Sequence, residues 1–291
     1  MNGRPAEEPS RTPVASAELG IEVCGVIKKL KGRLILDRVE LEVPRGSLAV
    51  LEGTNGSGKT TLIRTLATVV SPDSGSALVN GFDVVKQSLE VRRSIGVSFA
   101  NERSLYWRIN AFENLELFGK IAGLSKAAIA QGSAELLEQL GLMSVSTLQV
   151  SMLSTGQRQR LMVARALLTD PAVVLLDEPF RGIDGEGLDA ILELVIDRVA
   201  KGATALIVAP VIDAIVSSAD AVFEIRDGIV RQTGNGPRSG ASGMDPGPVA
   251  PGVVPEAAPV ETIDNRPDTS PRPADRGGRL PGSDEPVGGR S

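Results

Sequence analysis

Apolar residues along the chain follow two alternating patterns. In the first, short runs of apolar and β-branched residues are continuous, which is typical of strands covered on both faces. In the second, apolar residues recur every three or four positions, which indicates helices with one buried face. The predicted strands are Leu48–Glu52, Ile95–Phe99, Val173–Asp177 and Ala205–Val208, and the predicted helices are Lys59–Thr68, Ala111–Ile121, Ala128–Leu140, Gln157–Leu168 and Gly187–Ala200.

This alternation of strands and helices predicts an α/β fold with a mostly parallel central sheet, because each crossover helix returns the chain to the start of the next strand. Two helical patterns in succession, between Ala111 and Leu140, interrupt the alternation. They predict a small helical subdomain inserted at about residues 100–168.

Composition divides the chain into three parts. Residues 1–18 are rich in Pro, Ser and Glu, and residues 234–291 hold 11 of the 19 prolines and no aromatic residue. Such segments bury too little apolar surface to offset the entropy of ordering them, so we expect a disordered leader and a disordered tail. The tail carries no recognisable docking motif, which favours a solubilising role over a regulatory one. Residues 19–233 suffice for one large α/β domain.

Charge and histidine content exclude several classes of function. With 31 Lys plus Arg against 36 Asp plus Glu, the net charge is −5, and no basic tract indicates a nucleic-acid partner. The chain has no histidine, which excludes a Ser/His/Asp or Cys/His catalytic arrangement and leaves carboxylates as general bases. Cys24 is the single cysteine and forms no intrachain disulfide, which suits a reducing cytoplasm.

The sequence predicts neither a secretory signal nor a membrane-spanning helix. Residues 1–18 lack the basic start and the apolar stretch of a signal peptide. The longest charge-free run near the end of the predicted domain, Gly202–Ile212, has eleven residues. A helix needs about twenty apolar residues to cross a bilayer.

A glycine-rich motif, G-x-x-x-x-G-K-[ST], follows the first predicted strand and runs directly into a predicted helix. Its glycines let backbone N–H groups converge on an anion, and the helix N-terminus adds positive potential. Lys59 can reach the β- and γ-phosphates of a nucleotide, and Thr60 would place its hydroxyl on Mg²⁺. The predicted phosphate-binding residues are Gly53, Thr54, Asn55, Gly56, Ser57, Gly58, Lys59, Thr60 and Thr61.

Two carboxylates end an apolar strand further along the chain. Asp177 closes the run Val173–Asp177 and Glu178 follows it, at a strand end, where ligands bind in parallel sheets. Asp177 can hold Mg²⁺ through its water shell, and Glu178 can align and deprotonate an attacking water. Acidic residues at strand ends are often only solvated. The pair therefore indicates a nucleotide site only in combination with the phosphate-binding motif.

A third motif, Leu153-Ser154-Thr155-Gly156-Gln157, lies at the start of the helix before the Asp177 strand. Ser154 and Gly156 at a helix N-terminus would suit a γ-phosphate, although Ser is also a favoured helix N-cap. With the other two motifs, this segment resembles the signature motif of the ATP-binding subunits of ABC transporters, especially those that serve export-type permeases on separate chains. The resemblance covers roughly residues 19–233.

The resemblance implies a P-loop NTPase fold with an antiparallel β portion near the N-terminus, and ATP with Mg²⁺ as ligands. It also implies a homodimer or heterodimer, because in the family the signature motif of one subunit closes over the nucleotide of its partner. Asp184 stands where the family has its D-loop and would lie across that interface. A turn in which Asp184 caps the next helix is an equally supported alternative.

Three positions depart from the family pattern. The adenine-stacking aromatic aligns with Leu30, the glutamine that links Mg²⁺ to the helical subdomain aligns with Ala100, and the switch histidine aligns with Pro210. Asn101 and Glu102 are candidates to replace the glutamine. Proline has no polar side chain with which to contact a γ-phosphate, so the departures predict slow hydrolysis.

The only tyrosine and the only tryptophan of the chain are adjacent, at Tyr106 and Trp107, between Arg103 and Arg108. Large aromatics and arginines are favoured at interface centres. The resemblance implies that this stretch lies by the groove that accepts a coupling helix of the permease. Packing within the helical subdomain is the alternative.

The leading hypothesis is a cytoplasmic ATPase, peripheral on the inner face of the cell membrane, that powers a separate permease, an exporter. A second hypothesis is a weakly catalytic subunit paired with a better equipped ATPase. A third is a soluble ABC ATPase without a permease. The single-domain length argues against a two-cassette translation ATPase, and the absence of basic stripes and long coiled coils argues against a DNA-repair ATPase, which leaves iron–sulfur assembly as an open form of the third hypothesis.

Overall fold

The computed structural model describes residues 18–100, 104–210 and 213–235. Nearly all of the predicted leader (1–18) and tail (234–291) lies outside the described residues, as do Asn101, Glu102 and Arg103.

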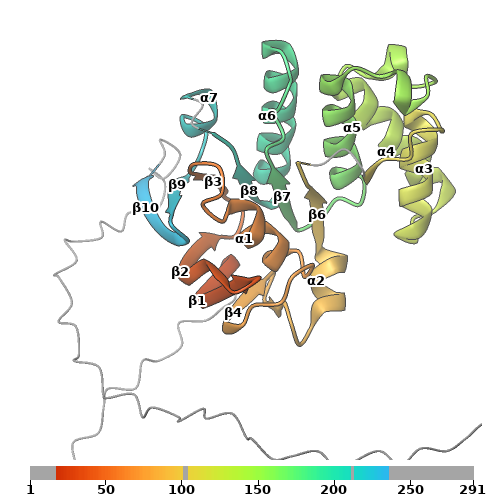
Figure 1. Cartoon of the computed structure of the whole chain (residues 1–291). Helices are drawn as coiled ribbons and strands as arrows, with labels where there is room; N and C mark the ends of the chain where they lie inside the picture. Colours follow the sequence, from red (N-terminus) through yellow and green to blue (C-terminus); the bar gives the residue numbers. More distant parts are fainter. Residues whose placement is uncertain (1–17, 101–103, 211–212, 236–291) are drawn as a thin grey trace, which may run out of the picture. The chain divides into compact units, whose positions relative to one another are not determined.

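A six-stranded sheet forms the centre of the described region (Figure 1). The strand order is β10 (Ile229–Asn235), β9 (Ala221–Arg226), β3 (Leu48–Glu52), β8 (Thr204–Val208), β7 (Val173–Asp177) and β6 (Ile95–Ser98). Four neighbouring pairs, from β9 to β6, are parallel, and the β10–β9 pair is antiparallel. Strands β3, β7 and β8 are buried along nearly their whole length, which explains why their sequences are apolar without alternation.

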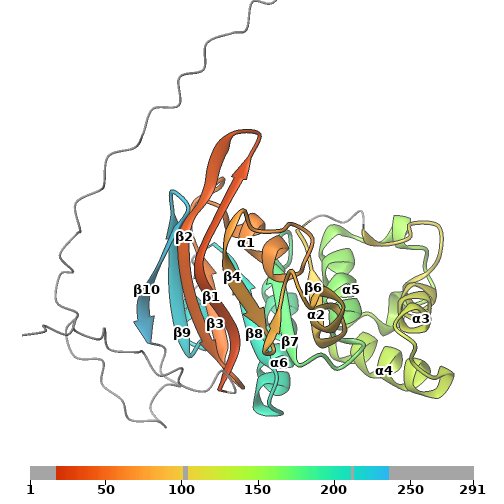
Figure 2. The ribbon, with the colours of Figure 1, turned by 90° about the horizontal axis from the view of Figure 1, so that it is seen from below.

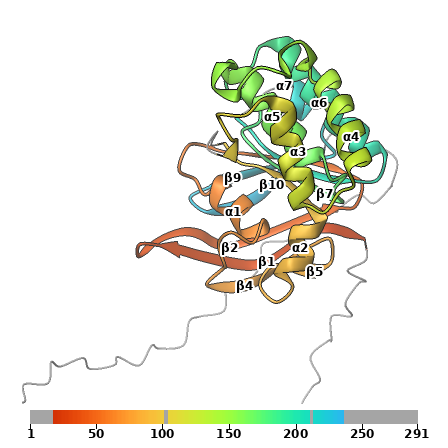
Figure 3. The same ribbon diagram turned by 90° about the vertical axis from the view of Figure 1, so that its right-hand side faces the viewer.

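A second, antiparallel sheet lies near the N-terminus, in the order β2 (Arg33–Pro44), β1 (Leu19–Leu30), β4 (Ser74–Val79) and β5 (Phe82–Asp83). Strands β1 and β2 meet in a two-residue turn at Lys31 and Gly32, whose φ angles of 50° and 77° fit a type I′ hairpin turn. Figure 3 shows this sheet below the central sheet, with helix α1 (Lys59–Leu66) in the layer between them.

The larger helices cover the opposite face of the central sheet, and α3 (Ala111–Ile121), α4 (Lys126–Gln139) and α5 (Thr155–Leu167) gather beyond its β6 edge (Figure 2). This group is the predicted inserted helical subdomain. Helices α4 and α5 begin two residues earlier than the periodicity predicts, because Ser125 and Ser154 cap their first turns. The remaining helices are α2 (Ser88–Ser94), α6 (Gly185–Ala200) and α7 (Asp213–Val216), and short 3₁₀ turns lie at Met143–Val145 and Val150–Met152.

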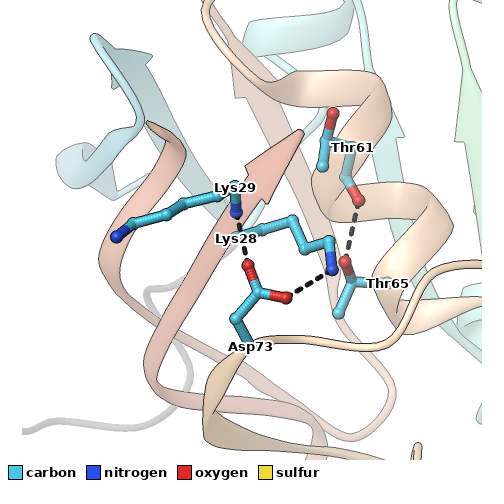
Figure 4. Close-up of polar contacts among 5 residues, drawn as sticks. All are labelled: Lys28, Lys29, Thr61, Thr65 and Asp73. Atoms are coloured by element: carbon cyan, nitrogen blue, oxygen red, sulfur yellow. Dashed lines mark hydrogen bonds and ion pairs between the residues drawn. The ribbon is translucent and has the colours of Figure 1, made fainter. Parts of the chain in front are cut away.

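An ion pair ties β1 to the chain that follows α1 (Figure 4). Lys28 Nζ donates to Asp73 Oδ1 at 2.6 Å, and the Lys29 backbone N–H donates to Asp73 Oδ2 at 2.6 Å. The Lys28 ammonium and the Lys29 N–H hold the pKa of the Asp73 carboxyl below its usual value. Within α1, the Thr65 hydroxyl donates to the Thr61 carbonyl at 2.9 Å. These bonds help hold the helix that follows the glycine-rich loop.

Strand β6 and helix α5 approach so closely that only glycine fits at position 96 of β6. A Cβ added to Gly96 would lie 1.9 Å from the Ala166 carbonyl oxygen and 2.7 Å from Pro171 Cγ. The contact joins the edge of the sheet to the helix that carries the third sequence motif.

We expect Gly96→Ala to destabilise the protein by about 1–3 kcal/mol, the usual cost of overpacking a closely packed interior. The measurement is equilibrium unfolding in urea. Gly132→Ala is the matched control, since a Cβ at this helical position meets Leu168 Cδ1 at an ordinary 3.5 Å. Alanine should stabilise helix α4 there by up to about 1 kcal/mol. Equal stabilities for the two variants would contradict the packing argument.

Candidate functional site

The glycine-rich loop between β3 and α1 is held by backbone atoms from both sheets. Gly53, Gly56 and Gly58 have φ angles of 154°, 82° and 115°, a region that other residues rarely adopt. A Cβ on Gly53 would lie 2.4 Å from the Ile225 carbonyl oxygen of β9, and one on Gly58 would lie 2.9 Å from the Ile35 carbonyl oxygen of β2. The loop therefore fits its surroundings only with glycine at these two positions.

Lys59 begins α1 and is 6% exposed. Its Nζ donates to the carbonyls of Gly53 and Thr54 at 2.6 and 2.9 Å. These bonds keep the ammonium against the loop, where a phosphate bound by the loop amides would meet it.

Asp177 ends β7 and is fully buried. Neither of its carboxylate oxygens has a hydrogen-bond partner among the described residues. Burial raises the pKa of this carboxyl above its usual value, and the Thr60 hydroxyl opposes that rise. A buried carboxylate with two free oxygens beside a threonine hydroxyl is a set of oxygen donors that suits Mg²⁺.

Glu178 is held in a left-handed backbone conformation, with φ 51°, which costs about 1–3 kcal/mol in a residue other than glycine. Two bonds hold it there. Its N–H donates to the Val208 carbonyl at 2.8 Å, and its carbonyl accepts from Gln159 Nε2 at 3.2 Å. Gln159 is 2% exposed. A glutamine among the buried positions of α5 is the sequence signal for this role.

A cavity of about 840 Å³ unites the loop with Glu178, within the roughly 300–1,000 Å³ typical of ligand sites. Of the predicted phosphate-binding residues, Thr54 and Ser57 do not line it, and Asp177 is not among the lining residues. Four lining residues, Arg33, Ile35, Phe180 and Arg181, were missed by sequence reasoning. The complete lining is Arg33, Ile35, Gly53, Asn55, Gly56, Gly58, Lys59, Thr60, Thr61, Glu178, Phe180, Arg181 and Pro210.

The three departures from the family pattern lie in different surroundings. Pro210 lines the cavity and lies two residues after the end of β8. Leu30 is 40% exposed and does not line it, whereas Arg33 and Ile35 on the next strand do. Ala100 is half-buried and also lies outside the lining.

The Leu153–Gln157 segment begins α5 and does not line the cavity. The Ser154 hydroxyl accepts from the Gln157 N–H at 3.2 Å, and Gln157 Oε1 accepts from the Ser154 N–H at 2.8 Å. This capping box is the helix-cap alternative raised by the sequence. Asp184 also acts as a cap, since its carboxylate accepts from the Gly187 N–H of α6 at 2.9 Å.

Tyr106 and Trp107 are 54% and 42% exposed. Tyr106 lies 5.9 Å from Phe118 between ring centroids, and the Arg158 guanidinium lies 5.1 Å from the centre of the Trp107 ring. Both rings therefore contact helices of the helical subdomain and remain partly exposed at the surface. Among residues 18–235 as described, no helix combines the length and the apolar character needed to cross a bilayer.

The chain is similar in sequence to proteins of one family. Residues 36–181 match the family model described as ABC transporter. The chain is 37% identical over 215 residues to the doxorubicin resistance ATP-binding protein DrrA of Mycobacterium tuberculosis, which covers 73% of this chain and 65% of that protein. It is 35% identical over 208 residues to the Nod factor export ATP-binding protein I of Cupriavidus pinatubonensis, which covers 71% of this chain and 63% of that protein.

A solved structure of the ATP binding subunit of an ABC transporter superposes with a TM-score of 0.69 and 27% identity, over 74% of this chain and 89% of that one. This similarity confirms the predicted fold. The chain spans a little under two thirds of the length of the two relatives. The family model nevertheless covers just over half of the sequence, and on that evidence the chain belongs to the ABC transporter family.

Proposed function

We propose that this chain is the ATP-binding and ATP-hydrolysing subunit of a transporter and that it powers a separate membrane permease. The observation that carries the proposal is the cavity in which the glycine-rich loop, Lys59 and Glu178 face one volume, with Asp177 buried behind them. ATP is the ligand that this set of groups fits best, because the loop amides and Lys59 match its β- and γ-phosphates.

Each residue of the site has a distinct task. The loop amides and Lys59 hold the phosphates in line for transfer, and Asp177 with Thr60 would hold Mg²⁺, which adds positive charge beside the β- and γ-phosphates. Glu178 lines the cavity and would accept a proton from the attacking water. Its constrained backbone supports this task, since a general base must be held at a fixed distance from the water.

The exposed pair Tyr106 and Trp107 is proposed as part of the contact with the permease. A relative named for Nod factor export supports the outward direction of transport. In this arrangement the chain is peripheral on the inner face of the membrane and dimerises, so that Ser154 and Gly156 complete the nucleotide site of the partner and Asp184 lies at the interface.

Pro210 favours a second candidate function. Because it offers no polar group at the cavity wall, the chain would suit the weakly catalytic position of a heterodimer with another ABC ATPase. A role without a permease is less well supported, since it leaves the exposed aromatic pair without a purpose.

Glu178→Gln should lower ATP hydrolysis by about 10²–10⁴, the usual contribution of a general base, and should leave ATP binding intact. Phosphate release and equilibrium binding of ATP measure the two effects. Glu193→Gln is the matched control on the exposed face of α6 and should hydrolyse ATP at the wild-type rate. Retained hydrolysis in Glu178→Gln would remove Glu178 from its proposed role.

Pro210→His should raise the slow turnover that we propose for this subunit, because a new donor at the cavity wall can stabilise charge on the γ-phosphate. A lost donor of this kind costs about 10²–10³ in rate, so a gain of tenfold or more is expected. Steady-state turnover of the purified subunit, alone and with its permease, tests this. A rate that the substitution leaves unchanged would contradict the explanation based on Pro210.

Trp107→Ala should abolish recruitment to membranes that contain the permease while ATP binding is unchanged, since the ring is partly exposed and does not line the cavity. Sedimentation of the chain with such membranes is the measurement. Val85→Ala, which alters an apolar side chain of similar exposure outside the helical subdomain, serves as the control. Normal recruitment of Trp107→Ala would exclude the proposed contact.

A further inference from the structure

Two cations in the cavity, Arg33 and Arg181, have no role in the arrangement described so far. Three lining residues are cationic, Arg33, Lys59 and Arg181, and of the described residues that line the cavity Glu178 alone is acidic. Lys59 is bonded to the loop carbonyls, and Arg33 lies on β2. Arg181 lies three residues after Glu178 and far from the phosphate loop in the sequence.

The backbone places Arg181 at the reaction end of the cavity. Its N–H donates to the Glu178 carbonyl at 3.3 Å, which closes a tight turn and brings residue 181 back beside residue 178. The Glu178 N–H is bonded in turn to the Val208 carbonyl, two residues before Pro210. Arg181, Glu178 and Pro210 therefore converge where β7 and β8 end.

The turn that carries Arg181 is held from both sides while the side chain stays accessible. Phe180 is 8% exposed, and a Cβ on Gly182, whose φ is 70°, would lie 3.1 Å from Thr155 Cγ2. Arg181 itself is exposed. Within the described part of the chain its guanidinium has neither an ion pair nor a side-chain hydrogen bond.

An anchored arginine with a free guanidinium, facing a cavity built for a polyphosphate, is suited to bind the terminal phosphate. Its planar fork of N–H donors matches the oxygens of a phosphoryl group in a bidentate way. A guanidinium at those oxygens stabilises the charge that develops during phosphoryl transfer. At this end of the cavity Pro210 supplies no donor.

We propose that Arg181 is a catalytic residue that contacts the γ-phosphate of bound ATP and offsets in part the donor that Pro210 does not supply. This inference rests on the proposed function. In the reaction, the water oxygen forms a bond to the γ-phosphorus, the bond from that phosphorus to the bridging oxygen breaks, and the electron pair leaves on ADP. The water proton passes to Glu178. Arg181 holds the charged oxygens of the transferred group throughout.

The test compares ATP with ADP, since only ATP carries the phosphate that Arg181 contacts. Binding is measured in the presence of Mg²⁺ by calorimetry, with Glu178→Gln as the background so that ATP persists. Arg181→Ala should weaken ATP binding tenfold or more and leave ADP binding unchanged. In the otherwise wild-type chain it should lower kcat by about 10²-fold, and Arg181→Lys should recover part of that loss because it keeps the charge.

Arg93→Ala, at an exposed arginine on α2, is the matched control and should change neither ligand's affinity. Thermal unfolding of each variant checks that the fold is intact. Equal weakening of ATP and ADP, or no weakening of either, would overturn the role of Arg181 and leave ATP binding by the wild-type chain in place. A wild-type chain that bound no ATP would instead overturn the proposed function itself.

Discussion

The site depends on one steric constraint, the close approach of three backbone segments around the glycine-rich loop. The loop lies against the Ile225 carbonyl of β9 on one side and the Ile35 carbonyl of β2 on the other. Gly228 completes the junction, since its carbonyl accepts from the Asp37 N–H at 2.9 Å and its N–H donates to the Ser57 carbonyl at 3.1 Å. Both sheets therefore meet at the loop, and a side chain at Gly53 or Gly58 would separate them. Packing that fixes the fold also fixes the direction of the loop amides.

Two features of the site lower the stability of the folded chain and favour the binding of a ligand. Asp177 is buried with two unpaired oxygens, and Glu178 is held in an unfavourable backbone conformation. Both features cost free energy in the folded chain, which is common at sites where activity requires pre-set geometry. A bound cation would relieve the first cost, because it supplies the positive counter-charge that the buried Asp177 carboxylate lacks. Folding of the surrounding strands must offset the second.

Residues 178–184 connect the cavity to the start of α5. Glu178 and Arg181 face the cavity, whereas Gly182 packs against Thr155, and a Cβ on Gly156 would lie 3.1 Å from the Gly182 carbonyl oxygen. Asp184 then caps α6. A change at the phosphate end of the cavity therefore acts on the same short segment that supports the helix N-terminus of the third motif. This shared segment gives ATP binding a physical route to the proposed dimer interface.

The sequence by itself determined those features that depend on neighbouring residues. The glycine-rich loop, the buried strands and helix α3 follow from short-range patterns, since steric limits on the backbone and the period of burial act over a few residues. The helix starts at Lys126 and Thr155 were displaced by two residues because the serine caps outweighed the apolar period. Only the tertiary structure decided which distant side chains share the cavity with the loop. Arg33 and Ile35 reach it through a hairpin, and Arg181 reaches it through a turn after β7, whereas Leu30, selected by alignment, does not line it. The placement of these distant residues around one cavity depends on strand order and register across more than a hundred residues, and no local pattern encodes it.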